Sequence, residues 1–169
     1  MSLHFIEFEL NGRTVEGMTE SRRTLLDYLR IDEGCTGPHA GCEHGVCGAC
    51  TVLVDGEAVR SCLMLAPQAN GKRVTTLEGL ADPDGTLHPI QQMFREEFAL
   101  QCAFCTPGFV MTLVALDRTE PRPAAAEMRA ALSGHLCRCT GYQGILRVVE
   151  RLAQSAETAS ESQGRNSGA

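Results

Sequence analysis

The first part of the chain alternates between apolar and polar positions. Residues 3–10 switch side-chain character at nearly every step, which is the period-two pattern of a strand with one buried face. Asn11 and Gly12 follow directly and favour a tight hairpin turn. Residues 14–17 are therefore expected to return as the partner strand.

The same pattern recurs further along, and one helix lies between the two predicted hairpins. Residues 51–54 and 57–60 flank the turn residues Asp55 and Gly56 and predict a second hairpin, and residues 73–77 predict one more strand. Between the hairpins, residues 24–30 place their large apolar side chains three and four positions apart, as in an amphipathic helix of about two turns. This half predicts a small sheet with a helix packed on one face.

After a turn-rich break at residues 81–85 the apolar spacing becomes helical. One helix is expected to begin at Pro89, with an apolar face formed by Ile90, Met93, Phe94 and Phe98. Three more are expected at residues 106–116, opened by a Thr106 cap and Pro107, at residues 124–132, and at residues 145–152. The helix at 106–116 is apolar on most sides, which is typical of the centre of a bundle.

These patterns divide the chain into two domains and a tail. We expect the first domain at residues 1–80 and the second at residues 81–154. Residues 155–169 contain no apolar side chain larger than alanine. Such a segment cannot offset the entropy lost on ordering, so a disordered tail is expected there.

Composition narrows the class of protein. With 169 residues, 43% hydrophobic and 21% charged, the chain resembles an ordinary globular protein. Its net charge of -6 argues against nucleic acid as a partner. The apolar runs are too short for a membrane span, and residues 1–10 lack the features of a secretory signal, so we expect a cytoplasmic protein. In a reducing compartment, nine cysteines point to metal binding or redox chemistry.

Four cysteines form a first cysteine set with the spacing C-x4-C-x2-C-x11-C. Its members are Cys42, Cys47, Cys50 and Cys62. The first three match the spacing of plant-type [2Fe-2S] ferredoxins, in which a glycine-rich loop wraps the cluster and a fourth cysteine completes it. Zinc or a Cys-Gly-Ala-Cys redox pair are the alternatives, although zinc ligands usually come as two closely spaced pairs.

A second cysteine set lies in the helical half. Its members are Cys102, Cys105, Cys137 and Cys139. Each pair falls between two predicted helices, and antiparallel packing can bring both connections to one end of a bundle. Spacing alone leaves a second iron-sulfur cluster and a zinc site open here. Cys35 lies outside both sets and is expected to be a free thiol.

Taken together, the motifs GCEHGVCGACTVLVDGEAVRSCL, LQCAFCTPGF and GHLCRCTGY resemble the small, two-cluster iron-sulfur subunit of the molybdenum hydroxylases. This is the xanthine dehydrogenase, aldehyde oxidase and carbon monoxide dehydrogenase family, and the resemblance covers about residues 3–153. It implies an α+β protein, with a ferredoxin-like β-grasp domain followed by an all-α four-helix bundle domain. Each domain would hold one [2Fe-2S] cluster.

The resemblance also implies roles and partners. The second cysteine set would lie beside a molybdopterin cytosine dinucleotide in a large subunit, and the first would face FAD in a medium subunit. Gln101 matches a glutamine whose amide touches the pterin, and the backbone of Cys139 is expected close to it. The complex would be a dimer of heterotrimers. Ala103 stands where the family usually has glycine, and His135 where it often has asparagine, so the cluster potential could differ while the ligands remain.

The motifs therefore predict an electron-transfer subunit of a molybdenum-dependent oxidoreductase, with the substrate chemistry in another chain. No serine-histidine-aspartate set, P-loop or dinucleotide fingerprint occurs in the sequence. Two alternatives belong to other classes of protein: a stand-alone ferredoxin-like electron carrier, and a zinc-stabilised interaction module without redox activity.

Overall fold

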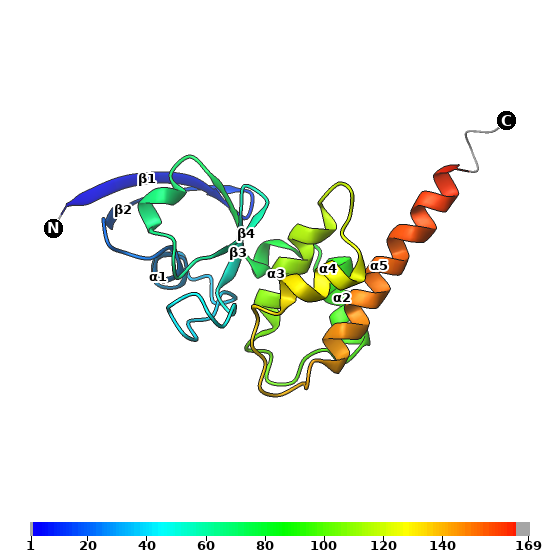
Figure 1. Ribbon diagram of the computed structural model, residues 1–169. Helices are drawn as coiled ribbons and strands as arrows, with labels where there is room; N and C mark the ends of the chain where they lie inside the picture. The colour runs from blue at the N-terminus through cyan, green and yellow to red at the C-terminus, as the bar shows by residue number, and fades with distance from the viewer. Residues whose placement is uncertain (1, 165–169) are drawn as a thin grey trace.

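The computed structural model describes residues 2–164, with side chains described for residues 2–155. The fold is mixed α+β. A five-stranded sheet forms the N-terminal half, and helices form the C-terminal half beside it (Figure 1). None of the helices in residues 2–164 is both long and apolar enough to cross a membrane.

Both predicted hairpins are present in the sheet. β1 (Leu3–Leu10) pairs antiparallel with β2 (Arg13–Glu20), and β3 (Thr51–Val54) pairs antiparallel with β4 (Glu57–Arg60). The short β5 (Arg73–Thr75) joins the hairpins, parallel to β1 and antiparallel to β3, in the order β2-β1-β5-β3-β4. The second strand is longer than predicted, and β5 ends earlier.

A short helical segment covers one face of the sheet. α1 (Leu25–Asp27) is capped by the Thr24 hydroxyl and continues as a π-helical turn, Tyr28–Asp32. The inward face of the sheet and this segment share a core, which confirms the predicted sheet and helix. Its large members are Ile6, Phe8, Leu10, Leu25, Tyr28 and Leu29.

Four helices form the second half. They are α2 (Pro89–Glu96), α3 (Thr106–Asp117), α4 (Ala125–Leu132) and α5 (Gln143–Gly164). As its all-round apolar sequence predicts, α3 is central and is buried along residues 107–114. It packs against α2 and α4, and also against β3, from which Leu53 enters the helical core.

The first helix of this half differs from its prediction at Phe98. Ile90 and Phe94 are buried, but α2 ends at Glu96 and Phe98 is 84% exposed. Phe98 adopts a left-handed backbone with φ 50°. The turn this produces buries Ala99 in its place, beside Gly144. The expected apolar face therefore stops one turn early.

Two other boundaries also need correction. The N-cap of α3 is Cys105, one residue before the predicted Thr106 cap, and the Thr106 hydroxyl is buried with no hydrogen-bond partner among the described residues. The tail expected at residues 155–169 begins as helix, because α5 continues to Gly164. Alanine and glutamate in that stretch favour helix even without apolar burial. The last five residues lie outside the described part of the chain.

Candidate iron-sulfur site

The β3–β4 hairpin brings half of the first cysteine set together. Cys50 precedes β3 and Cys62 follows β4, so the antiparallel pairing places them side by side, buried with Leu26. The Ser61 hydroxyl donates to the Cys50 carbonyl at 2.7 Å and holds the base of the hairpin. Burial raises the pKa of Cys62 to about 11, and the adjacent Cys50 thiol adds to that rise. These two sulfurs form one close pair.

The glycine-rich loop supplies the other pair, Cys42 and Cys47. Its backbone is left-handed at Glu43, Gly45 and Gly48, with φ values of 57°, 84° and 78°. These turns aim backbone N–H groups inward, and the N–H of Cys47 donates to the Cys42 sulfur at 3.3 Å. That bond, helped by the N–H of residue 44, lowers the pKa of Cys42 to about 6. The loop therefore stabilises a thiolate without a nearby cation.

The second cysteine set forms in two connections, one between α2 and α3 and one between α4 and α5. Cys102 lies between α2 and α3, Cys105 caps α3, and Cys137 and Cys139 lie between α4 and α5. The sulfurs of Cys102 and Cys139 are 3.5 Å apart, and the thiols of Cys105 and Cys137 interact. The predicted convergence of the two helix connections thus occurs.

The pKa values of Cys105 and Cys137 shift in opposite directions. Burial raises the pKa of Cys105 to about 12, and Cys137 adds to the shift. Burial acts in the same direction on Cys137, but the hydroxyl and the backbone N–H of Thr140, 3.1 and 3.4 Å from its sulfur, outweigh it and lower the pKa. The Tyr142 hydroxyl accepts the backbone N–H of Cys137 at 2.9 Å and keeps this loop in place.

The pairwise arrangement bears on which metal the thiols fit. All nine cysteines are free. Among the described side chains, no three His, Cys, Asp or Glu residues gather closely enough to hold a single ion. A tetrahedral zinc site needs four donors around one point, whereas each iron of a [2Fe-2S] core takes two protein ligands. The close pairs of thiols within each set match the two protein ligands that each iron of such a core takes.

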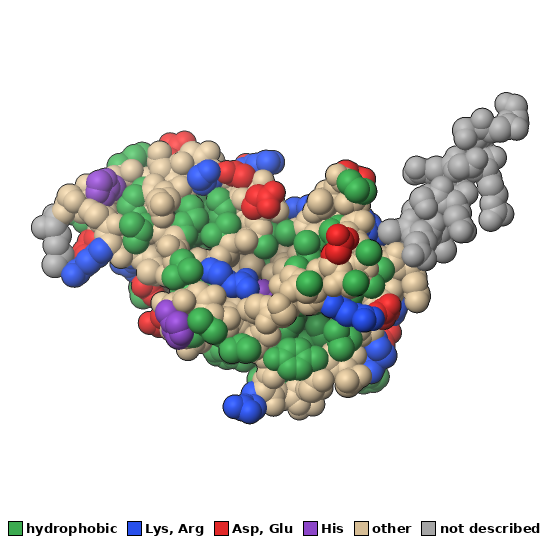
Figure 2. All heavy atoms as spheres, viewed as in Figure 1, with side chains coloured by type: hydrophobic (Ala, Val, Ile, Leu, Met, Phe, Trp, Pro, Cys, Tyr) green, Lys and Arg blue, Asp and Glu red, His purple; other side chains and the backbone are tan. Residues whose placement is uncertain are grey.

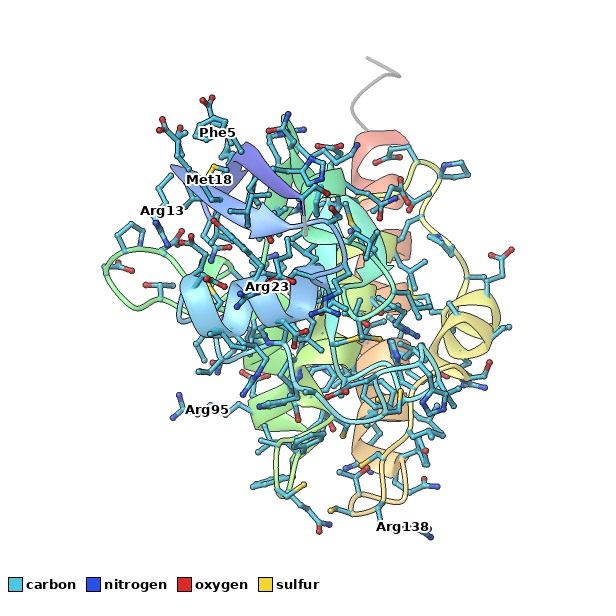
Figure 3. The ribbon with its side chains drawn as sticks, turned by 90° about the vertical axis from the view of Figure 1, so that its left-hand side faces the viewer. Phe5, Arg13, Met18, Arg23, Arg95 and Arg138 are labelled. Atoms are coloured by element: carbon cyan, nitrogen blue, oxygen red, sulfur yellow. The ribbon has the colours of Figure 1, made fainter. Side chains whose placement is uncertain are left out.

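The two sets open on a common cavity. It has a volume of about 620 Å³ and lies where the loops of both sets meet. Arg138, at its rim, projects outward from the connection between α4 and α5 (Figure 3). Sulfurs from both sets line it, together with apolar side chains: Cys42, Cys47, Cys102, Cys105, Cys137, Cys139, Phe104, Leu136 and Tyr142.

Direct contacts join the two sets. The N–H of Leu136 donates to the carbonyl of Cys47 at 3.0 Å. His39 stacks on Phe104 with ring centroids 4.5 Å apart, and its Nδ1 is 2.8 Å from the Phe104 carbonyl. The Nδ1 of His44 lies 2.5 Å from the Cys42 carbonyl. Both histidines therefore contact backbone carbonyls and help to hold the loops of the site in place.

The remaining predicted positions fall in distinct surroundings. Gln101 is exposed next to Cys102, so its amide is available to a partner. Ala103 has φ 63°, a conformation that glycine adopts without strain and alanine does not. Cys35 is buried in the core of the sheet, away from both sets, where burial raises the pKa of its thiol.

His135 is buried and contacts two side chains that are distant in the sequence. Only 2% of it is exposed. Burial, followed by the adjacent Arg60 charge, lowers the pKa of His135 to about 4, so the ring is neutral at pH 7. Its partners Arg60 and Thr112 are 75 and 23 residues away in the chain. No local pattern in the sequence indicates either contact.

Each half of the chain matches the model of a known protein family. Residues 8–81 match the family model described as a 2Fe-2S iron-sulfur cluster binding domain, and residues 76–150 match the one described as a [2Fe-2S] binding domain. Together they span most of the chain. The matches define a protein with two [2Fe-2S] clusters, one in each half.

Similar proteins of known name indicate the kind of enzyme complex in which such chains occur. The chain is 52% identical over 144 residues to the nicotine 6-hydroxylase small subunit of Paenarthrobacter nicotinovorans, covering 85% of this chain and 86% of that one. It is 48% identical over 162 residues to caffeine dehydrogenase subunit gamma of Pseudomonas sp. strain CBB1, covering 94% and 96%. In the crystal structure of quinoline 2-oxidoreductase from Pseudomonas putida 86, one chain matches with a TM-score of 0.84 and 42% identity, covering 92% of this chain and 97% of that one.

The chain belongs to the family of small iron-sulfur subunits of the molybdenum hydroxylases, the group that includes xanthine dehydrogenase. It is an electron-transfer subunit of a molybdenum-dependent oxidoreductase. The resemblance predicted from the motifs is thereby confirmed.

Proposed function

We propose that this chain relays electrons between a molybdopterin cytosine dinucleotide in a large partner subunit and FAD in a medium one. The second cysteine set would face the molybdenum side and the first the flavin side. The observation that carries this proposal is the junction of the two sets: they share one cavity, and the backbone of Leu136 bonds directly to Cys47. Cys102 and Cys139 of the second set are exposed, as a set that faces a partner would be.

Eight thiolates would hold the two clusters, which supply one-electron redox chemistry when bound. The ligands are Cys42, Cys47, Cys50 and Cys62 for one and Cys102, Cys105, Cys137 and Cys139 for the other. The chain's own contribution is to keep these sulfurs paired and to aim N–H and O–H donors at them, as Cys47 does toward Cys42 and Thr140 toward Cys137. Gln101 and the backbone of Cys139 would contact the pterin.

The architecture we propose is a ferredoxin-like β-grasp domain, residues 1–80, followed by a four-helix bundle domain, residues 81–154. Two separate hydrophobic cores support this division, one under the sheet and one among the helices. Leu53 of β3 is the exception, because it enters the helical core. We take that contact as part of the interface between the domains.

A permanent complex fits the surface better than a free carrier does. Apolar side chains gather along the lower side of the molecule, around the loops of the two cysteine sets (Figure 2). Phe104 and Leu136 are 45% and 55% exposed beside the shared cavity. Exposed apolar groups of this kind favour stable interfaces. We propose a heterotrimer that dimerises, in the cytoplasm, where a reducing environment would keep all nine cysteines free.

Iron and acid-labile sulfide analysis, with low-temperature electron paramagnetic resonance of the reduced protein, tests the cluster assignment. We expect about four irons and four sulfides per chain and two distinct S = 1/2 signals. Zinc in place of iron would overturn the assignment. Purification of the co-expressed complex tests the partners: a small chain that elutes alone as a stable two-cluster monomer would favour the free carrier.

A further inference from the structure

A hydrogen-bond network lies where the two domains meet, half-buried at Arg60 and fully buried at Thr51, Thr112 and His135. Arg60, at the end of β4, is its centre. One terminal nitrogen (Nη1) donates to the Thr51 hydroxyl, and the other (Nη2) is 3.1 Å from both the Gly134 carbonyl and the Nδ1 of His135. Thr51 in turn donates to the Gly48 carbonyl at 2.6 Å. The network therefore links the first-set loop, the sheet and the second-set loop.

The chemistry of Arg60 determines how the His135 ring is protonated. A guanidinium has only donors, so Nδ1 of His135 must accept. With Nδ1 as the acceptor, the ring N–H lies on Nε2, which is 2.7 Å from the Thr112 hydroxyl in α3 and donates to it. The two ring nitrogens thus have different partners, one in the sheet domain and one in the helical domain.

Packing leaves the ring little freedom. The edge of Phe109 approaches it with centroids 4.9 Å apart. A Cβ on Gly48 would overlap the imidazole, so the first-set loop passes directly against the ring. Leu136, the next residue, donates its N–H to Cys47, and Cys137 follows. Any movement of His135 would therefore shift a ligand-bearing loop of one set relative to the other.

We propose that His135 is a positioning residue that sets the spacing between the two cysteine sets by accepting the Arg60 hydrogen bond at Nδ1. The bond to Arg60 spans the domains, whereas the bond to Thr112 stays within the helical one. The inference rests on the proposed ligand sets and adds to them a residue that binds no metal.

Two substitutions of similar size separate the two bonds. In His135→Asn the amide oxygen takes the place of Nδ1, so the Arg60 bond can persist while the Thr112 bond is lost. In His135→Gln the amide group reaches the place of Nε2, so the Thr112 bond can persist while the Arg60 bond is lost. Thr112→Val is the matched control, because it removes the Thr112 hydroxyl and leaves Arg60 and His135 unchanged.

The measurements are made on the full chain loaded with iron. Hydrogen exchange reports the Leu136 N–H that bonds to Cys47, and paramagnetic resonance of the fully reduced protein reports the magnetic splitting between the two clusters, which depends on their separation. For His135→Gln we expect Leu136 to exchange roughly tenfold faster or more and the splitting to change, with iron content at the wild-type value. His135→Asn and Thr112→Val should resemble wild type in both.

Equal behaviour of His135→Asn and His135→Gln, in either measurement, would overturn the proposal. So would an unchanged splitting in His135→Gln at full iron content. Failure of the proposed function has a different signature, because wild type itself would then contain fewer than about four irons per chain. Arg60→Lys provides a second route: lysine cannot donate to Thr51, Gly134 and His135 in the same planar arrangement, so it should reproduce the His135→Gln result.

Discussion

The two cysteine sets are built in opposite ways. The first is wrapped by a loop whose glycines turn the backbone N–H groups toward sulfur, and two of its four thiols, Cys50 and Cys62, are buried. The second is assembled from two connections between helices, and two of its thiols, Cys102 and Cys139, are exposed. The first set is therefore largely covered by this chain, whereas the second is open to the surface at Cys102 and Cys139.

This difference indicates how each site is completed. This chain itself covers much of the first set, because Cys50 and Cys62 are buried and backbone N–H groups hydrogen-bond to Cys42. The second set leaves sulfurs at the surface beside the apolar side chains Phe104 and Leu136. A partner subunit packed against this surface would cover the exposed sulfurs, as expected for a subunit that works inside a complex.

The largest effects are expected from substituting one cysteine of each set, because each substitution should remove one cluster and leave the other. Cys50→Ser and Cys105→Ser should each reduce iron from about four to about two per chain, because a serine hydroxyl does not replace a thiolate at neutral pH. Each variant should lose one paramagnetic signal and keep the other. Disappearance of both signals in either variant would indicate one shared site or global unfolding.

The next largest effect is expected on stability, when Gly108→Ala adds a methyl group where the two domains touch. Gly108, in the first turn of α3, lies so close to the carbonyl of Gly48 that a Cβ would overlap it. We expect Gly108→Ala to destabilise the protein by about 1–3 kcal/mol, measured from the urea midpoint. Gly134→Ala is the milder comparison, since a Cβ there would lie 3.3 Å from the Arg60 side chain, which would have to shift by only a few tenths of an ångström. Equal midpoints for the two variants would contradict the tight contact.

Chelation should then distinguish the sets by rate. In the isolated small chain, the second set should lose iron to a chelator several-fold faster than the first, because Cys102 and Cys139 are exposed. The decay of the two paramagnetic signals measures both rates in one sample. Assembly with the large subunit should slow the faster loss, and a second-set signal that outlasts the first would reverse the comparison.

The smallest effect is expected at the ninth cysteine. Cys35 lies in the sheet core outside both sets, so Cys35→Ser should leave the iron content unchanged. Burying a hydroxyl in place of the thiol should lower stability by about 1 kcal/mol. Iron analysis and a thermal melt check both statements, and a drop in bound iron would show that the ligand assignment is incomplete.

Much of the fold was predictable because its causes are local. Alternation and the Asn11-Gly12 turn identified the first hairpin, and the apolar character of residues 106–116 identified the central helix. The structure departs from the sequence-based predictions where two local tendencies compete. Phe98 fits the helical period, but the chain leaves the helix before reaching it. The predicted tail lacks apolar residues, yet helix propensity carries α5 to Gly164.

By itself the sequence determined the class of chemistry and the family, because cysteine spacing within one loop or one helix connection is a property of neighbouring residues. Only the tertiary structure decided how the two sets meet. The bond from Leu136 to Cys47 and the one from Arg60 to His135 join residues far apart in the chain, 75 positions in the second case. Such contacts depend on how two domains dock, and no period or motif along the chain encodes docking directly.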